Sequence, residues 1–294
     1  MNLPVSRQNA EITTQSQPIA THSDYIVSIA PNTAKAIEAA LNSFFNAGQN
    51  IDNLTDATLA AYVQHSIDAG LSINTIKTRV ALLRKFSQDT LGITIPVKGS
   101  IHGLKIKAYS RSKNQSAGRG QANGLSDVDV MAAIKAIDTD KLTGKRDAAL
   151  LYFSMVTAGR VSETISYKVK DIDESRKVIL LRSSKTDQEG QGTYKHLSNN
   201  LIVLLKDYIS CAGLSGEDVI FNLSARHINR IIKQHLGDGY SSHSFRVGFI
   251  ETAIQRGLTE SSIMLTTKHK TSRMVAHYGQ KSNQANSAAA SMFS

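Results

Sequence analysis

Four short stretches of this sequence carry side chains that could bind and attack an anion. The stretches are TAGRVSET, LRSSKTDQ, SSHSFRVG and TKHKTSRMVAHYGQ. Their reactive members are Arg160, Glu163, Lys185, His243, Arg246, His269 and Tyr278. A guanidinium stays charged and offers a planar fork of donors, which suits the oxygens of a phosphate. A tyrosine phenol has an ordinary pKa of about 10, so as a nucleophile it needs neighbouring groups to activate it.

Each stretch also has an ordinary explanation. An arginine at a helix end can pair with the helix dipole, and a lysine in a hairpin turn is usually solvated. Two polar residues three apart on a helix often form a surface face, and a tyrosine that follows apolar residues is often a packed ring. The order and the gaps distinguish this set, because Arg246 precedes His269 by 23 residues and His269 precedes Tyr278 by nine.

Taken in order as Arg, Lys, H-x-x-R, His and Tyr, the set resembles the motif of the tyrosine recombinase (phage integrase) family, and the resemblance extends over nearly the whole chain. GLSINTIKTRVALLRKF and HSFRVG are most similar to the Cre-type recombinases of phages and plasmids. Three positions differ from the usual pattern. Lys268 stands where the family usually has glycine, Thr157-Ala158-Gly159-Arg160 stands for T-G-x-R, and Val247 stands where histidine is frequent. Glycine permits backbone conformations that are unfavourable for lysine.

The resemblance implies a site-specific recombinase that cleaves and rejoins DNA strands through a 3′-phosphotyrosine and a Holliday junction, without ATP, a metal or another cofactor. Tyr278 is the expected nucleophile. Arg160 and Arg246 are expected to hold the non-bridging phosphate oxygens. Lys185 is the expected general acid for the leaving 5′-oxygen.

Three further residues receive supporting roles from the same resemblance. His243 is expected to help remove the Tyr278 proton or to bond a phosphate oxygen. His269 is expected to donate a hydrogen bond to the same phosphate. Glu163 is expected to orient neighbouring cations or His243.

Other chemistries lack their usual motifs. The sequence contains no G-x-x-x-x-G-K-[ST], H-E-x-x-H or C-x-x-C, which argues against nucleotide triphosphate and zinc chemistry. Ser110 and Lys113 match S-x-x-K, but they have no companion motif and we interpret the match as chance. A single cysteine, Cys211, fits a reducing cytoplasm, which is the expected location.

The hydrophobic periodicity predicts a mainly α (α+β) protein. An all-helical domain precedes a mixed helical domain with a small antiparallel sheet or hairpin. The resemblance implies that the first is a core DNA-binding domain, that the second is the catalytic domain, and that the two form a C-shaped DNA clamp. We expect a flexible arm at 1–22, the helical domain at 23–108, a basic linker at 109–124 and the catalytic domain at 125–294, with a tail from about 280. Helices are expected at 33–47, 55–68, 70–92 and 98–108, then from 125, at 144–158 and 200–210, and in ARHINRIIKQHL, SHSFRVGFIETAIQRG and TSRMVAHYG. Ser72 and Ser126 are the expected N-caps of the helices at 70–92 and from 125. A hairpin is expected at 177–198 and an extended piece at 218–221.

The charge indicates a polyanionic partner. The net charge is +10, and no acidic residue lies between Asp89 and Asp127. A solvated helix face and a simple tether are the alternatives for the cations of the first half. The expected DNA-binding residues are Lys77, Arg79, Arg84, Lys85, Lys105, Lys107, Arg111, Lys113 and Arg119.

The expected partner is double-stranded DNA with an inverted-repeat recombination site. The resemblance further implies a homotetramer on two DNA sites, closed by exchange of the C-terminal tail between protomers. The alternatives are a type IB topoisomerase-like or telomere-resolving strand transferase, and a catalytically silent DNA-binding accessory protein of the same fold. Membrane binding is not expected, since no basic amphipathic helix stands apart from the fold.

Overall fold

A computed structural model describes residues 22–112, 122–182, 192–269 and 271–279 of the chain. The protein divides into two compact units, Met1–Arg119 and Gly120–Ser294. Each unit is described by itself.

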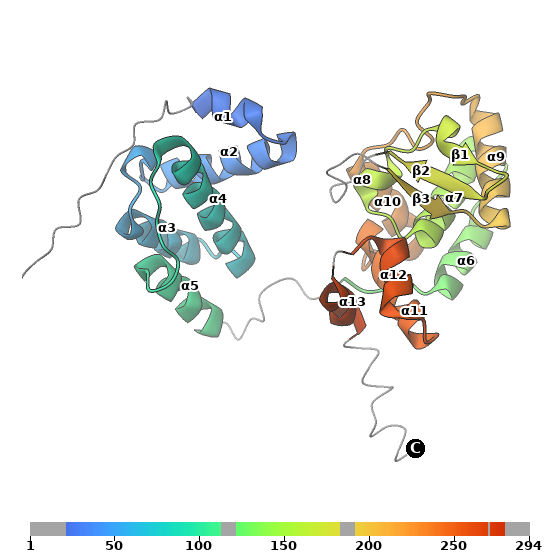
Figure 1. Ribbon diagram of the computed structural model, residues 1–294. Coiled ribbons are helices and arrows are strands. Elements are labelled where there is room, and N and C mark those ends of the chain that lie inside the picture. Colours follow the sequence, from blue (N-terminus) through green and yellow to red (C-terminus); the bar gives the residue numbers. More distant parts are fainter. Residues whose placement is uncertain (1–21, 113–121, 183–191, 270, 280–294) are drawn as a thin grey trace, which may run out of the picture. The chain divides into compact units, whose positions relative to one another are not determined.

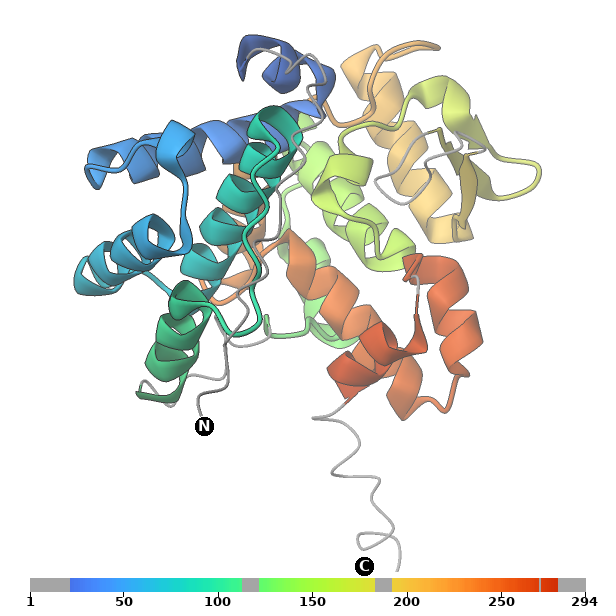
Figure 2. The same ribbon diagram turned by 60° about the vertical axis from the view of Figure 1, so that its left-hand side comes forward.

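The first unit is entirely helical over its described residues (Figures 1 and 2). Helix α4 packs against α2, α3 and α5, and α3 also packs along α5. The apolar stripe expected on 70–92 faces the core, where Ile76 and Leu83 are fully buried. Ser72 caps α4 as predicted, by accepting a hydrogen bond from the Thr75 amide. The elements of this unit are α1 (His22–Ser28), α2 (Pro31–Asn46), η1 (Ile51–Asn53), α3 (Asp56–Asp68), α4 (Ile73–Leu91) and α5 (Ile101–Ser112).

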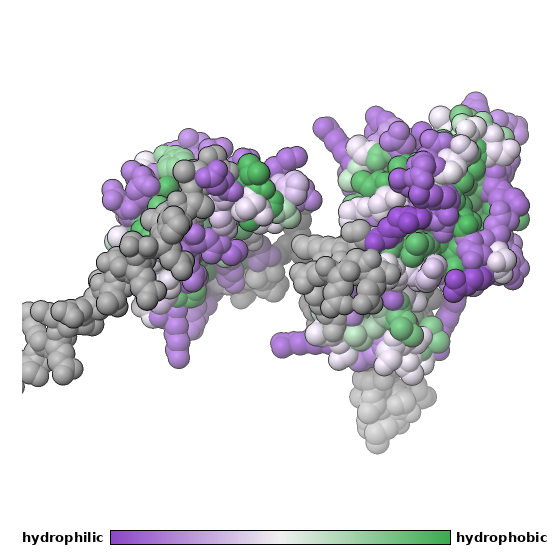
Figure 3. Space-filling model, turned by 45° about the horizontal axis from the view of Figure 1, so that its top comes forward, coloured by the Kyte–Doolittle hydropathy of each residue, from purple (hydrophilic) through white to green (hydrophobic). Residues whose placement is uncertain are grey.

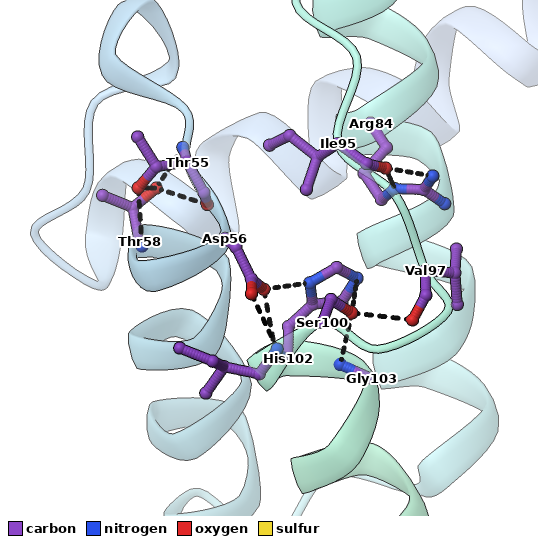
Figure 4. A network of polar contacts seen from close by, with 10 residues as sticks. Thr55, Asp56, Thr58, Arg84, Ile95, Val97, Ser100, His102 and Gly103 are labelled. Carbon is purple, nitrogen blue, oxygen red and sulfur yellow. Dashed lines mark hydrogen bonds and ion pairs between the residues drawn. The ribbon is translucent and has the colours of Figure 1, made fainter. Parts of the chain in front are cut away.

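A carboxylate joins the starts of α3 and α5 (Figure 4). Asp56 accepts hydrogen bonds from the Ile101 amide at 2.7 Å, the His102 amide at 3.1 Å and His102 Nδ1 at 2.6 Å. Ser100, His102 and Asp56 are the residue types of a Ser-His-Asp catalytic triad, but their hydrogen bonds are those of a helix cap. The Ser100 hydroxyl donates to the Val97 carbonyl at 2.8 Å and lies 3.5 Å from His102 Nε2, and Ser100 is buried. The network therefore caps α5 and fixes its position on α3.

The second unit is built around α7, in which every residue from 147 to 154 is buried. Helix α7 packs against α6, α9 and α11, and a three-stranded antiparallel sheet of order β1-β2-β3 lies beside α9 (Figure 1). In β2 and β3 the register places Val178 opposite His196 and Leu181 opposite Thr193. The elements are α6 (Asp127–Ala136), α7 (Leu142–Thr157), α8 (Val161–Thr164), η2 (Val169–Asp171), β1 (Ile172–Asp173), β2 (Val178–Leu181), β3 (Thr193–His196), α9 (Asn199–Ala212), α10 (Ala225–Leu236), α11 (Ser242–Gln255), α12 (Glu260–Thr267) and α13 (Ser272–Gly279).

The glycine of HSFRVG has a packing role. The chain that enters the second unit crosses α11 at Gly248, and the Leu125 amide donates to the Ser244 carbonyl there at 3.1 Å. A Cβ on Gly248 would lie 1.9 Å from the Leu125 carbonyl oxygen. Any larger residue would therefore displace the entering chain from the helix that carries His243 and Arg246.

A small separate core supports the end of the chain that carries the tyrosine. Ile250 and Ala253 of α11, Ile263 of α12 and Val275 of α13 are buried together, and Tyr278 packs against them. Because α13 is short, its position depends on this contact rather than on its own helix propensity.

The mainly α fold with a small antiparallel sheet is as predicted, but individual elements differ from the predictions. The periodicity did not reveal the helices α1, α8 and α12, the short 3-10 helices η1 and η2, or the strand β1. Helix α5 continues to Ser112, four residues into the expected linker. The extended piece expected at 218–221 contains an isolated antiparallel bridge, between Lys168 and Val219. The expected arm, most of the linker and the expected tail lie outside the described residues.

The surface carries no extended apolar face in the view of Figure 3, where hydrophilic side chains predominate and smaller apolar areas lie between them. No helix in the described part of the chain is long and apolar enough to cross a membrane.

Asp56→Ala should lower the free energy of unfolding of the first unit by about 1–3 kcal/mol, because two amides and the buried His102 ring lose their acceptor. Burial raises the pKa of Asp56, but the bonds from Ile101 and His102 outweigh burial and leave this pKa lowered. The stabilisation is thus present at neutral pH and lost as the pH falls into the acid range. Urea unfolding, with amide exchange of residues 101–112, measures the change. The exposed Glu38→Ala is the control, and equal losses for the two variants would contradict the capping role.

Candidate active site

The structure brings most of the predicted catalytic residues together in the second unit. Side-chain contacts and charge interactions connect α8, α11, the turn after α12 and α13. Those residues are Arg160, Glu163, His243, Arg246, His269 and Tyr278. Lys185, the seventh, lies outside the described residues.

Arg246 lies at the centre of the group and is 2% exposed. Its Nη1 donates to the Ala158 carbonyl at 3.0 Å, and its Nη2 donates to the Thr267 carbonyl and, at 3.2 Å, to His269 Nε2. The two carbonyls belong to the carboxyl ends of α7 and α12, where the helix dipoles favour a cation. Burial, followed by the charge of Arg160, lowers the pKa of Arg246 to about 10, so it remains a cation at neutral pH.

His269 lies in the turn between α12 and α13 and is a neutral ring. Burial and the charges of Arg246 and Arg160 lower its pKa to about 4. Since Nε2 accepts from Arg246, the ring proton is assigned to Nδ1, which lies 2.8 Å from Thr267 Oγ1. Thr267 Oγ1 in turn donates to the Ile263 carbonyl at 2.8 Å. Both ring nitrogens are thus engaged within the protein.

Tyr278 and His243 face each other from α13 and α11. Tyr278 Oη lies 3.2 Å from His243 Nε2, and the Tyr278 ring also lies 5.7 Å from the His269 ring between centroids. Burial and the charges of Arg246 and Arg160 lower the pKa of His243, so at neutral pH this ring can accept the tyrosine proton. The pair therefore has the geometry and the protonation state of a nucleophile with its base.

Arg160 and Glu163 form a bidentate pair at the start of α8. Glu163 Oε1 accepts from Arg160 Nη1 at 2.8 Å, while its Oε2 accepts from the Arg160 amide at 2.9 Å. The carboxylate side chain is 4% exposed and the guanidinium side chain 28% exposed. Glu163 thus fixes the orientation of Arg160 and leaves part of the guanidinium open to solvent.

Comparison with known proteins assigns the chain to a family. The sequence profile described as the phage integrase family matches residues 125–285, more than half of the chain. The chain belongs to the phage integrase family of tyrosine recombinases. It is 26% identical over 253 residues to an integrase/recombinase XerD homologue of Selenomonas ruminantium, a match that covers 77% of this chain and 73% of the relative.

Solved structures show the same fold for this family member. The Tn1549 transposon integrase, determined in complex with transposon right end DNA, matches with a TM-score of 0.67 at 14% identity, over 88% of this chain and 93% of that one. The XerH recombinase, determined with a palindromic difH substrate, matches with a TM-score of 0.60 at 20% identity, over 81% of this chain and 72% of that one. Both were determined bound to DNA.

Two of the positions that differ from the usual family pattern have a left-handed backbone. Ala158 ends α7 with φ 45°, and Lys268 ends α12 with φ 55°. This region favours glycine, which explains why the family usually has glycine at these positions and why Ala158 and Lys268 are strained there. Ala158 carries one of the carbonyls that hold Arg246, and Lys268 follows the other. The strained turns are therefore part of the support of the site.

A buried lysine that our sequence reading missed lies beneath the same group. Lys195 of β3 is 2% exposed. Burial, with the charges of Arg246, Lys268 and Arg160 added, lowers its pKa to about 8, although Glu163 acts in the opposite direction. The alternation of β3 gave a signal, because the buried Leu197 lies two residues on and places Lys195 on the inward face.

The expected DNA-binding cations of the first unit have different partners. Arg84 donates through Nε to the Ile95 carbonyl at 2.7 Å, Arg79 to Ser43 Oγ at 2.8 Å and Lys105 to Gln64 Oε1 at 2.8 Å. Lys85 is paired with Asp89 at 2.6 Å. Lys77, Lys107 and Arg111 line, with Arg84, an open groove of about 470 Å³ between α4 and α5. Lys113 and Arg119 lie outside the described residues.

Helix α10 carries a second cationic face, which our sequence reading did not include. Arg226, Arg230 and Lys233 are exposed at helical spacings of four and three, and they line an open groove of about 810 Å³. Ile228, Ile231 and Ile232 hold the opposite face in the core. Asn229 Oδ1 accepts from the Ser242 amide at 2.8 Å, which ties α10 to the helix of His243. The signal was present in ARHINRIIKQHL, where cations and isoleucines separate onto two faces.

No group of three or more His, Cys, Asp or Glu side chains suited to a metal ion occurs among the residues described.

Lys268→Gly should raise the melting temperature of the catalytic unit by about 1–4 °C, because it relieves a left-handed strain on the order of 1 kcal/mol and removes a cation from a crowded cluster. Differential scanning calorimetry measures the shift. Lys177 has φ 53° in an exposed turn, so Lys177→Gly relieves the strain alone and should give a smaller gain. Lys268→Ala removes the charge alone. A lower melting temperature for Lys268→Gly would show that the lysine side chain itself stabilises the turn.

Proposed function

We propose that this protein is a site-specific DNA recombinase in which Tyr278 cleaves one strand and becomes a 3′-phosphotyrosine. The observation that carries the proposal is the pairing of Tyr278 Oη with the neutral His243 at 3.2 Å, beside the buried cation of Arg246. A tyrosine so placed has a base for its proton and lies next to a cation that can hold the phosphate it attacks. Membership of the phage integrase family supports the same chemistry.

Arg160 and Arg246 supply the sites for the non-bridging oxygens of the scissile phosphate. The pentacoordinate transition state concentrates negative charge on those oxygens, and fixed guanidinium donors stabilise it more than they stabilise the diester. Glu163 orients Arg160, and the carbonyls of Ala158 and Thr267 orient Arg246. The arginines therefore need little reorganisation when the reaction occurs.

His269 would act on the phosphate after a rearrangement. In the structure its Nε2 accepts from Arg246, so no ring N–H is directed to an incoming oxygen. A bound phosphodiester supplies an acceptor for Arg246 and stabilises a cationic imidazole. Under these conditions His269 can donate through Nε2, as the family resemblance implies.

Lys185 would protonate the 5′-oxygen as it leaves. The phosphotyrosine conserves the energy of the diester, so a 5′-hydroxyl from a second strand can reverse the reaction without ATP or a metal. Exchange of one strand between two duplexes then gives a Holliday junction, which a second exchange resolves. We propose a homotetramer on two DNA sites, with residues 280–294 as the segment exchanged between protomers.

Both units would contact duplex DNA with an inverted-repeat site, closing on it as a C-shaped clamp. The groove cations of the first unit, Lys77, Lys107 and Arg111, and the cationic face of α10 support this assignment. A similar protein from Selenomonas ruminantium supports a bacterial setting, and we place the activity in the cytoplasm.

Tyr278→Phe should abolish covalent trapping of a nicked suicide duplex that carries the protein's own site, because the residue supplies the attacking oxygen. The wild-type protein should form a complex that survives a denaturing gel and carries the 3′ end of the cut strand. Tyr240→Phe, a tyrosine outside the described cluster, is the control and should trap DNA normally. Trapping by Tyr278→Phe would assign another nucleophile, and DNA binding without trapping by the wild type would indicate an accessory protein.

Arg226→Ala should weaken binding to the specific duplex by about 1–3 kcal/mol and flatten the dependence of affinity on salt if the exposed guanidinium meets a base or a phosphate. Fluorescence anisotropy at several salt concentrations measures both. Lys206→Ala on α9 removes the same charge from a side chain paired with Glu174, and should change neither. Equal effects of the two substitutions would mean that Arg226 contributes to DNA binding only through the net charge of the protein.

A further inference from the structure

Lys195 is a buried ammonium that the proposed reaction does not use. It occupies an inward position of β3, where a strand of this kind normally carries an apolar side chain. Removing an ammonium from water is costly, and well-packed apolar residues often replace buried charges without loss of stability. The position of the lysine therefore calls for a reason other than packing.

The ammonium connects the same two helix ends that hold Arg246. Lys195 Nζ donates to the Thr266 carbonyl and lies 3.4 Å from the Thr157 carbonyl. Arg246 donates to the next carbonyl in each chain segment, those of Ala158 and Thr267. The two cations thus bridge α7 and α12 in adjacent layers, directly at the two left-handed turns.

From this geometry we infer that Lys195 is a positioning residue for the phosphate-binding site. Its ammonium holds the carboxyl ends of α7 and α12 in the relative position at which their carbonyls hold the Arg246 guanidinium. The inference rests on the proposed function, since it concerns the presentation of Arg246 to a DNA phosphate.

The charges around Lys195 determine how this support depends on pH. Glu163 on α8 attracts the ammonium, whereas Arg246 on α11, Arg160 before α8 and Lys268 after α12 repel it. The charge of Lys195 adds to burial and the arginine charges in lowering the pKa of His269. Tyr278 interacts electrostatically with Arg246. The lowered pKa of about 8 means that Lys195 is charged at neutral pH and loses its proton as the pH rises past that value. A neutral amine donates more weakly to the Thr266 carbonyl, so the support weakens on the alkaline side.

The test compares single-turnover trapping of the suicide duplex at saturating protein with DNA affinity measured by anisotropy. Lys195→Met removes the donors and the charge, Lys195→Gln keeps a donor, and Lys195→Arg keeps both. Lys206→Met, which removes an exposed lysine of the same unit, is the matched control. Calorimetric melting reports which variants fold.

Lys195→Met should cleave roughly 10- to 100-fold more slowly than the control, since displacements on the order of 1 Å at a reacting centre have effects of this size. Its DNA affinity should stay within about threefold of the control, because Lys195 is buried and does not reach the surface. Lys195→Gln should fall between Met and wild type. In an Arg246→Lys background, the fold reduction in cleavage rate caused by Lys195→Met should be less than a third of the reduction it causes in the wild-type background, because the two residues act as one unit.

The rate ratio of Lys195→Arg to wild type should rise above pH 8, because the guanidinium keeps its proton where the ammonium loses it. This ratio cancels contributions from other titrating groups, and it decides the inference even where Met and Gln do not fold. A flat ratio, or trapping by Lys195→Met at the control rate, would overturn the inference while trapping by wild type and control upholds the proposed function. Equal effects of Lys195→Met in both Arg246 backgrounds would also overturn it.

Discussion

A guanidinium removed from water needs acceptors around it, and the way Arg246 obtains them organises the catalytic unit. Its acceptors are the carbonyls of Ala158 and Thr267 at the carboxyl ends of α7 and α12, together with His269. Backbone carbonyls satisfy the donors without neutralising the charge, whereas a carboxylate in the same place would cancel it. The site therefore keeps a positive charge for an anion while its donors remain satisfied. The cluster carries one paired carboxylate, Glu163, which is engaged by Arg160.

The use of these carbonyls as acceptors explains why the backbone is strained at Ala158 and at Lys268. Each carbonyl lies at a helix end, where the chain must turn sharply, and the turn residues Ala158 and Lys268 adopt left-handed conformations that cost roughly 1–2 kcal/mol each. Such conformations persist only where the surroundings hold them. Arg246 and Lys195 bond to successive carbonyls at these turns, those of Ala158 and Thr157 in one and those of Thr267 and Thr266 in the other. Strain and buried charge thus stabilise each other: the cations hold the turns, and the turns present the carbonyls that solvate the cations.

The sequence allowed the helical fold, the caps at Ser72 and Ser126 and the identity of the clustered residues to be predicted, because each depends on local pattern or on ordered spacing. The partners of individual cations could not be predicted in this way. Arg84 is held by the Ile95 carbonyl, a contact made by a chain reversal that periodicity does not encode. Lys195 was missed because a lysine between polar neighbours reads as solvated unless the strand's inward face is known. The short α12, which separates His269 from α11, lacks an amphipathic pattern and depends on tertiary contacts with α11 and α13.

Burial and the same positive charges keep both histidines neutral. Burial, with the charges of Arg246 and Arg160 added, lowers the pKa of His243 and of His269, so both rings are neutral at neutral pH. A negatively charged ligand would reverse this effect by screening the arginines, and the imidazoles would then take up protons more readily. In the proposed reaction, a bound phosphodiester therefore makes His243 a stronger base for the Tyr278 proton and allows His269 to become a donor to a phosphate oxygen. The cations that would bind the phosphate thus also set how basic the two rings are.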